Sequence, residues 1–145
     1  MQYRRSFLRP FSQAGLTLIE LMVVVALLGI ITAAALPSYQ QHLMRSRRAD
    51  AQAALAAITQ AQEAYRGNHS LYADSLARLG FTPPASSNYD FALSSNSEPP
   101  FEAGYQIMAT ARSGSPQMRD TQCRLLSIRL QAGQLSYADA ACWPR

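Results

Sequence analysis

The sequence predicts an α+β fold in which one long N-terminal helix packs on a small antiparallel β-sheet. An apolar run of twenty-one residues, Leu16–Leu36, stands near the start of the chain. A stretch with helical apolar spacing follows it, and segments with strand-like alternation come later. At 145 residues the chain has room for one globular domain and an anchor, but too little sequence for two full cores.

The apolar run is long enough to cross a membrane, because a helix of this length reaches about 30 Å, the thickness of the hydrocarbon layer. Arg4, Arg5 and Arg9 precede it, and this positive flank predicts that the N-terminal end stays in the cytoplasm. Gly29 and Pro37 weaken the helix by about 1 and about 3 kcal/mol. The stretch between them is therefore a place where the helix can kink or unwind.

The residues after Pro37 have the spacing of an amphipathic helix. Its more apolar face is formed by Met44, Ala51, Leu55, Ile58, Gln62 and Tyr65, and its polar face by Arg48, Gln52, Thr59, Gln60, Glu63 and Arg66. Gly67 and Asn68 supply a stop signal. If this stretch continues the apolar run, the helix has about fifty residues and a length of roughly 70 Å.

Three later segments alternate like half-buried strands: residues 89–94, 105–111 and 124–130. A probable hairpin at residues 131–134 joins the third to a fourth segment, and a long connection covers 67–100. We expect an antiparallel sheet that places its apolar face on the amphipathic half of the helix and leaves its other face wet.

Two cysteines, Cys123 and Cys142, lie on the side of the membrane that the positive flank places outside the cytoplasm. An oxidising compartment favours a disulfide over two free thiols, and a bridge that closes about twenty residues would contribute roughly 3 kcal/mol. His42 and His69 are far apart and no other cysteine is present, so a zinc site lacks ligands. We predict no metal and no cofactor.

The charge distribution argues only weakly for nucleic-acid binding. All thirteen basic residues are arginines, but from Leu16 onward ten arginines face nine acids, and the net charge falls from +4 to +1. Arg45, Arg47 and Arg48 form a small cluster that could bind phosphate on a lipid or on DNA. A solvated or snorkelling face beside the membrane is the favoured interpretation.

Nothing in the sequence indicates an enzyme. Asp50, Glu63 and Asp74 form no recognisable carboxylate pair, and the neighbours His69 and Ser70 belong to no nucleophile motif. The aromatic residues of the middle region fit packing better than a ligand site: Tyr65, Tyr72, Phe81, Tyr89 and Phe91.

Glu20 is the unusual residue of the apolar run, because an ionised group costs roughly 2.5–3.5 kcal/mol near a bilayer centre. A secretory signal with an h-region at 21–31 and cleavage after Ala35 would release a soluble protein, but it leaves Glu20 unexplained. An ordinary single-pass anchor leaves it unexplained too.

The residues "GLTLIE" at 15–20, followed by about sixteen apolar residues, resemble the type IV prepilin signal. The resemblance implies cleavage between Gly15 and Leu16 by prepilin peptidase, N-methylation of Leu16, and pairing of Glu20 with the N-terminus of a neighbouring subunit, which sets the axial register. Gly29 and Pro37 stand where type IVa pilins carry the Gly and Pro that bound a segment unwound in the filament.

The whole chain, with its late disulfide and terminal "CW", is similar to the minor pilins of the type IVa system, and most to those of PilE type. The resemblance implies a pilin fold with a cleaved leader at 1–15, a membrane and filament-core helix at 16–37, and a periplasmic head at 38–145.

The function that this resemblance implies is that of a structural subunit of a type IV pilus, not an enzyme. Its partners would be other pilins, the peptidase and the pilus assembly machinery of the inner membrane. It would span that membrane once, with its N-terminus in the cytoplasm, before it enters an extracellular pilus that serves twitching, adhesion or DNA uptake. A type II secretion pseudopilin and a DNA-receptor pilin are the alternatives.

Overall fold

The computed structural model describes residues 15, 17–84, 87–96 and 100–143. They divide into two compact units, Met1–Tyr39 and Gln40–Arg145, and one helix, α1 (Leu18–Arg66), runs from the first into the second. The single long helix expected from the sequence is therefore confirmed. Most of the expected leader, residues 1–14, and the expected new N-terminus, Leu16, lie outside the described residues.

The first unit consists of the apolar half of α1. Its large side chains are all exposed, from 48% at Val24 to 77% at Leu18. By length and composition this is the one described helix that could cross a membrane. Pro37 lies within the helix, and neither it nor Gly29 ends the element.

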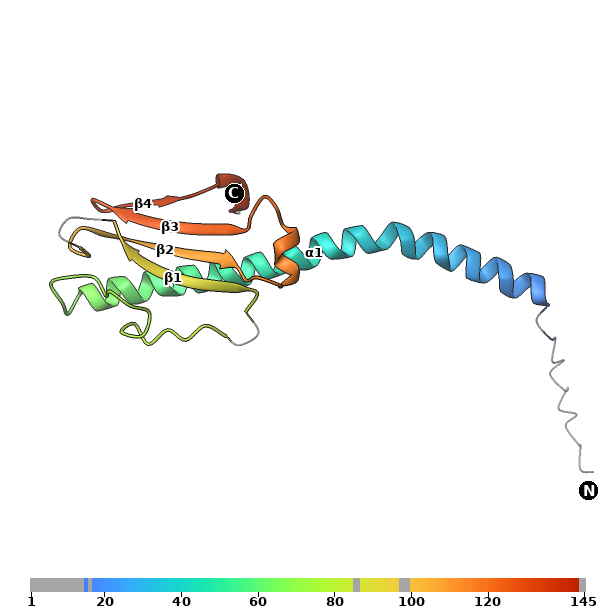
Figure 1. Ribbon diagram of the computed structural model, residues 1–145, viewed down its shortest axis with the longest axis horizontal. Coiled ribbons are helices and arrows are strands. Elements are labelled where there is room, and N and C mark those ends of the chain that lie inside the picture. The colour runs from blue at the N-terminus through green and yellow to red at the C-terminus, as the bar shows by residue number, and fades with distance from the viewer. Residues whose placement is uncertain (1–14, 16, 85–86, 97–99, 144–145) are drawn as a thin grey trace, which may run out of the picture. The chain divides into compact units, whose positions relative to one another are not determined.

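The second unit contains a four-stranded antiparallel sheet with the strand order β1-β2-β3-β4 (Figure 1). The strands are β1 (Tyr89–Ser95), β2 (Gly104–Ala111), β3 (Leu125–Gln131) and β4 (Gln134–Tyr137). All four expected strands are thus present. Two short 3-10 helices, η1 (Pro116–Arg119) and η2 (Ala140–Cys142), precede β3 and follow β4.

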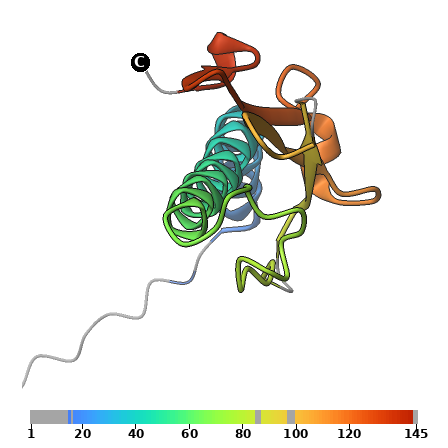
Figure 2. The same cartoon turned by 90° about the vertical axis from the view of Figure 1, so that its left-hand side faces the viewer.

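The amphipathic half of α1 lies along one face of this sheet, as the view along the helix shows (Figure 2). Ala51, Leu55 and Ile58 are buried there, and the sheet contributes its inward side chains to the same core: Tyr89, Tyr105, Ile107, Ala109, Ala111, Leu126, Ile128 and Leu130. The alternation of these positions along each strand is what the sequence pattern predicts.

Two local features explain the remaining connections. The buried Gln62 side chain bonds both backbone groups of Ala73 (2.9 and 3.0 Å), so a polar residue is tolerated on the buried face of the helix. The β3–β4 hairpin turns through Ala132 and Gly133, whose φ angles of 48° and 77° match a two-residue turn that follows the twist of the strands.

Candidate functional site

The start of α1 places Glu20 in the first helical turn. The Thr17 hydroxyl accepts a hydrogen bond from the Glu20 backbone N–H (3.3 Å), which makes Thr17 the N-cap. Among the described residues the Glu20 carboxylate has no hydrogen-bond or ion-pair partner, so only half of a capping box is formed. The pattern Thr-x-x-Glu signals this cap in the sequence, and our sequence analysis missed it.

The large side chains of the apolar half of α1 are exposed in the described part of the chain. In the 18-residue window that marks this helix as long and apolar enough to cross a membrane, no residue is buried. At Gly29 nothing apart from the helix backbone lies within 4 Å of the position where a Cβ would stand. The missing side chain is therefore not required by packing within this chain.

The helix contains two weak points close to each other. Pro37 has no N–H to donate to the carbonyl four residues earlier. The second weak point is Thr32, whose side-chain hydroxyl donates to the Leu28 carbonyl (2.7 Å). A side-chain bond of this kind often bends a helix. The described helix is continuous here, and unwinding in a filament stays a prediction.

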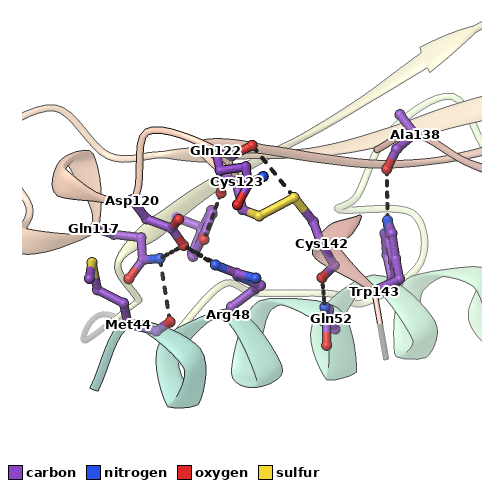
Figure 3. Close-up of a disulfide and its surroundings, with 11 residues drawn as sticks. Met44, Arg48, Gln52, Gln117, Asp120, Gln122, Cys123, Ala138, Cys142 and Trp143 are labelled. Carbon is purple, nitrogen blue, oxygen red and sulfur yellow. Dashed lines mark hydrogen bonds and ion pairs between the residues drawn. A yellow bond between two sulfur atoms is a disulfide. The ribbon is translucent and has the colours of Figure 1, made fainter. Parts of the chain in front are cut away.

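In the second unit, Cys123 and Cys142 form the expected disulfide, with Cα atoms 5.7 Å apart. Figure 3 shows that the bridge lies above α1 and that helix side chains reach up to it. The Gln52 amide donates to the Cys142 carbonyl (2.6 Å), and the Trp143 indole donates to the Ala138 carbonyl (2.8 Å). The disulfide thus joins the C-terminal segment to the turn before β3, and Gln52 joins it to the helix.

Arg48 corrects one expectation. We expected a solvated face, but Arg48 forms an ion pair with Asp120 (2.6 Å), and their side chains are only 20% and 8% exposed (Figure 3). Gln117 donates to the same carboxylate oxygen (2.9 Å). The prediction failed because the partner acid is 72 residues away and leaves no local signal in the sequence.

Burial also alters two tyrosines of the core. Desolvation raises the pKa of Tyr105 to about 12, and the same cause raises the pKa of Tyr89. The Tyr89 hydroxyl donates to the Cys123 carbonyl (3.1 Å), whereas the Tyr105 hydroxyl has no hydrogen-bond partner in the described part of the chain. Both rings therefore act as packing residues, as expected for Tyr89.

Two exposed arginines mark the region around β3. Arg124, just before the strand, donates to the Met118 carbonyl (2.9 Å), and Arg129 donates to the Gln106 side chain (3.1 Å). Neither forms an ion pair with a described acid. Both guanidinium groups therefore add positive charge to the exposed surface of the head near β3.

Two of the residues considered earlier for metal or catalytic chemistry, His69 and Asp74, have structural contacts. Within the described ranges, no group of three or more His, Cys, Asp or Glu side chains could hold a metal ion. Asp74 pairs with Arg78, and the His69 ring stacks on Tyr65 with ring centroids 3.8 Å apart. These contacts are structural.

Two protein-family models match the chain. Residues 37–127, more than half of it, match the family described as "Type IV minor pilin ComP, DNA uptake sequence receptor". Residues 10–36 match the "Prokaryotic N-terminal methylation motif". The two matches meet between Leu36 and Pro37, at the end of the apolar run.

Similar curated proteins are type IV pilins. The type IV major pilin protein PilA of Myxococcus xanthus is 36% identical over 80 residues, 55% of this chain and 36% of the relative. PilE1 of Neisseria gonorrhoeae is 36% identical over 74 residues, 51% and 45% of the two chains. FimA of Dichelobacter nodosus is 57% identical over 35 residues, 24% and 22%. The chain thus spans less than half the length of these relatives.

Proposed function

Because the chain belongs to the type IV minor pilin family, we propose that it is a structural subunit of a type IV pilus. It is held in the inner membrane by the apolar half of α1, with its head in the periplasm, until the assembly machinery transfers it to the filament. The pilin matches favour a pilus over the pseudopilus of type II secretion. The proposed role includes no catalytic step.

The observation that carries the proposal is the uncovered apolar surface of α1 between Leu18 and Leu36. Such a surface needs an apolar environment, and lipid or the helices of neighbouring subunits can supply one. The methylation motif lies over the same residues, which links the surface to prepilin processing. One helix then serves first as an anchor and later as an assembly surface.

Glu20 is proposed to set the register of assembly. Cleavage between Gly15 and Leu16 would create a methylated ammonium group one helical turn from this carboxylate. The Glu20 carboxylate has no partner among the described residues, and a buried carboxylate becomes tolerable when a cation pairs with it. The ammonium group of a neighbouring subunit is the partner that the filament would supply.

The segment between Gly29 and Pro37 is proposed to unwind in the filament. Glycine costs about 1 kcal/mol relative to alanine in a helix, and Pro37 removes one backbone hydrogen bond. Because no described residue packs where a Gly29 side chain would stand, the glycine is available for close approach of another helix.

The register role is tested by Glu20→Ala in cells that assemble this pilus. We expect cleavage and methylation to proceed, with the N-terminus measured by mass spectrometry. The amount of the variant in sheared pili should fall at least tenfold relative to its amount in the membrane. Glu63→Gln is the matched control, since Glu63 is an exposed acid on the same helix, and it should assemble normally. Normal incorporation of Glu20→Ala would refute the register role.

Processing is tested separately by Gly15→Ala, which should leave the leader attached. The intact mass of the protein distinguishes the two forms. Detection of a mature Leu16 N-terminus in this variant would contradict the peptidase assignment, and a wild-type chain that begins after Ala35 would contradict the whole prepilin interpretation.

We also propose that the head binds DNA, as the description of the matched family suggests. The exposed pair Arg124 and Arg129 supports this proposal, because each guanidinium is oriented by a neutral acceptor and faces no described acid. The net charge of +1 after the leader argued against it, but a net charge says nothing about where the charges lie.

DNA binding is tested with the full cleaved chain in detergent and a labelled duplex, by fluorescence anisotropy at several salt concentrations. Arg124→Gln/Arg129→Gln should weaken binding and lower the slope of log K against log salt by about 1.8, because two phosphate contacts are lost. Arg78→Gln is the control, since Arg78 already pairs with Asp74. An unchanged slope in the double variant would exclude these arginines as the DNA surface.

A further inference from the structure

The arginines that directly follow the membrane segment are not used by the proposed function. Arg45, Arg47 and Arg48 stand nine to twelve residues after Leu36, and no acid lies between Leu36 and Arg48. In the proposed topology this positive flank lies outside the cytoplasm, although basic residues usually gather on the cytoplasmic side. Removal of the leader also removes the arginines of the other flank. The orientation of the protein in the membrane therefore does not explain the positive charge of Arg45, Arg47 and Arg48.

All three arginines belong to the second unit, in the part of it that comes first in the sequence. Together with Arg119 of η1 they form what we call the arginine collar: Arg45, Arg47, Arg48 and Arg119. Arg48 is fixed by Asp120, and this pair binds α1 to the turn after η1. Among the described residues, none of the other three collar arginines forms an ion pair.

The collar opens onto two hollows that lie entirely within the second unit. A polar hollow of about 390 Å³ is lined by Arg45 and Arg48 together with the amides of Gln41 and Gln122. A smaller hollow of about 170 Å³ is lined by Arg47 and Arg119. The acid in the larger hollow, Asp120, already accepts bonds from Arg48 and Gln117. The Arg45 guanidinium and the N–H groups of the two amides can donate hydrogen bonds to an anion there.

The collar begins a short stretch of chain after the membrane segment. Arg45 follows Leu36 by about 14 Å of helix, and the headgroup layer adds about 5–8 Å beyond the hydrocarbon. An arginine side chain can extend back toward that layer while its stem lies along the helix. Tyr39, which is 60% exposed, stands between Leu36 and Arg45 in the sequence. Tyrosine is a residue that gathers at the interface between membrane and water.

We propose that the arginine collar binds the phosphates of anionic lipid headgroups on the periplasmic leaflet, and so holds the head against the inner membrane until extraction. The proposal rests on the membrane topology of the proposed function. Only nine and eleven residues separate Leu36 from Arg45 and Arg47, so the lipid surface is the anionic surface closest to them along the chain when the apolar half of α1 is inserted. DNA would have to enter between the head and the headgroups to reach the same side chains.

The test uses the full cleaved chain in nanodiscs of equal parts phosphatidylglycerol and phosphatidylcholine. Native mass spectrometry counts the lipids of each kind that the protein retains. Each arginine near an anionic surface should favour phosphatidylglycerol by about fivefold, so Arg45→Gln/Arg47→Gln should lower the ratio of the two lipids by up to about 25-fold. Arg48 is left unchanged because its ion pair supports the fold.

The matched control, Arg78→Gln/Arg112→Gln, removes the same charge from two exposed arginines that already pair with acids, and it should keep the wild-type lipid ratio. Raising NaCl from about 0.05 M to about 0.5 M should weaken the lipid preference of the wild type, because exposed charges are screened. An unchanged ratio in Arg45→Gln/Arg47→Gln would overturn the proposal. Displacement of the lipid by soluble glycerol phosphate would overturn it as well, since the ligand would then be a free phosphate.

Two further outcomes distinguish the lipid proposal from the proposals that the head binds DNA and that the chain is a pilus subunit. If Arg45→Gln/Arg47→Gln lowers duplex binding and leaves the lipid ratio unchanged, the collar is a nucleic-acid surface and the lipid proposal is wrong. The nanodisc assay needs no pilus. A protein that enters pili normally but shows no preference for phosphatidylglycerol would therefore refute the collar proposal alone.

Discussion

Replacement of Arg48 by Met should destabilise the head strongly, because it leaves the Asp120 carboxylate buried without its cation. The Asp120 side chain is 8% exposed, and two Arg48 nitrogens lie 2.6 and 3.2 Å from one of its oxygens. Breaking a buried pair costs about 3–5 kcal/mol. Because Arg48 is one-fifth exposed and Gln117 still donates to the acid, we expect the lower end, about 3 kcal/mol.

The reverse variant, Asp120→Asn, should cost less, about 1–2 kcal/mol, because the Arg48 guanidinium can reach water through its exposed part. The combined variant should cost less than the sum of the two, with a coupling of about 2 kcal/mol. The free energy of unfolding is measured by urea denaturation of the full cleaved chain in a mild detergent, followed by Trp143 fluorescence. A loss below about 1 kcal/mol for Arg48→Met, the value of a surface pair, would refute this reasoning.

Three further predictions concern the core of the head. Burial raises the pKa of Tyr105 to about 12, so its stabilising contribution is complete below about pH 10 and is lost as the pH rises through about 12. Tyr105→Phe should remove this loss in denaturation curves recorded between these pH values. Gly104→Ala should cost about 3 kcal/mol in urea denaturation, because its Cβ would clash with the Leu130 carbonyl oxygen; a neutral effect would contradict the close approach. Cys123→Ser/Cys142→Ser should cost about 3 kcal/mol through lost loop closure, and an unchanged midpoint would show that the bridge does not constrain the unfolded chain.

Much of the fold could be predicted from local patterns. The apolar run and the spacing of Ala51, Leu55 and Ile58 predicted one long helix with two different halves, and those three residues are buried. The alternation of apolar residues predicted the first three strands, and the turn at residues 131–134 predicted the fourth. These patterns succeed because burial on one side of a helix or sheet imposes a period on neighbouring residues.

The contacts between distant segments could not be predicted in this way. The pairing of Arg48 with Asp120 and of Gln62 with the Ala73 backbone depends on how the chain returns to the helix. No local period records such a return. The polar residues on the buried side of α1 were therefore visible in the sequence, but their partners were not.

The sequence alone determined the prepilin signal, the helix, the strands and the presence of two cysteines, since each depends on residues close together in the chain. Only the tertiary structure decided which arginines are bound and which remain available. Arg48 pairs with Asp120, and Arg129 donates to the neutral Gln106 side chain. Arg45 and Arg47 form no ion pair with a described acid. The physical reason is that an arginine's free energy depends on the charges and the water that folding places around it, and these come from distant parts of the chain.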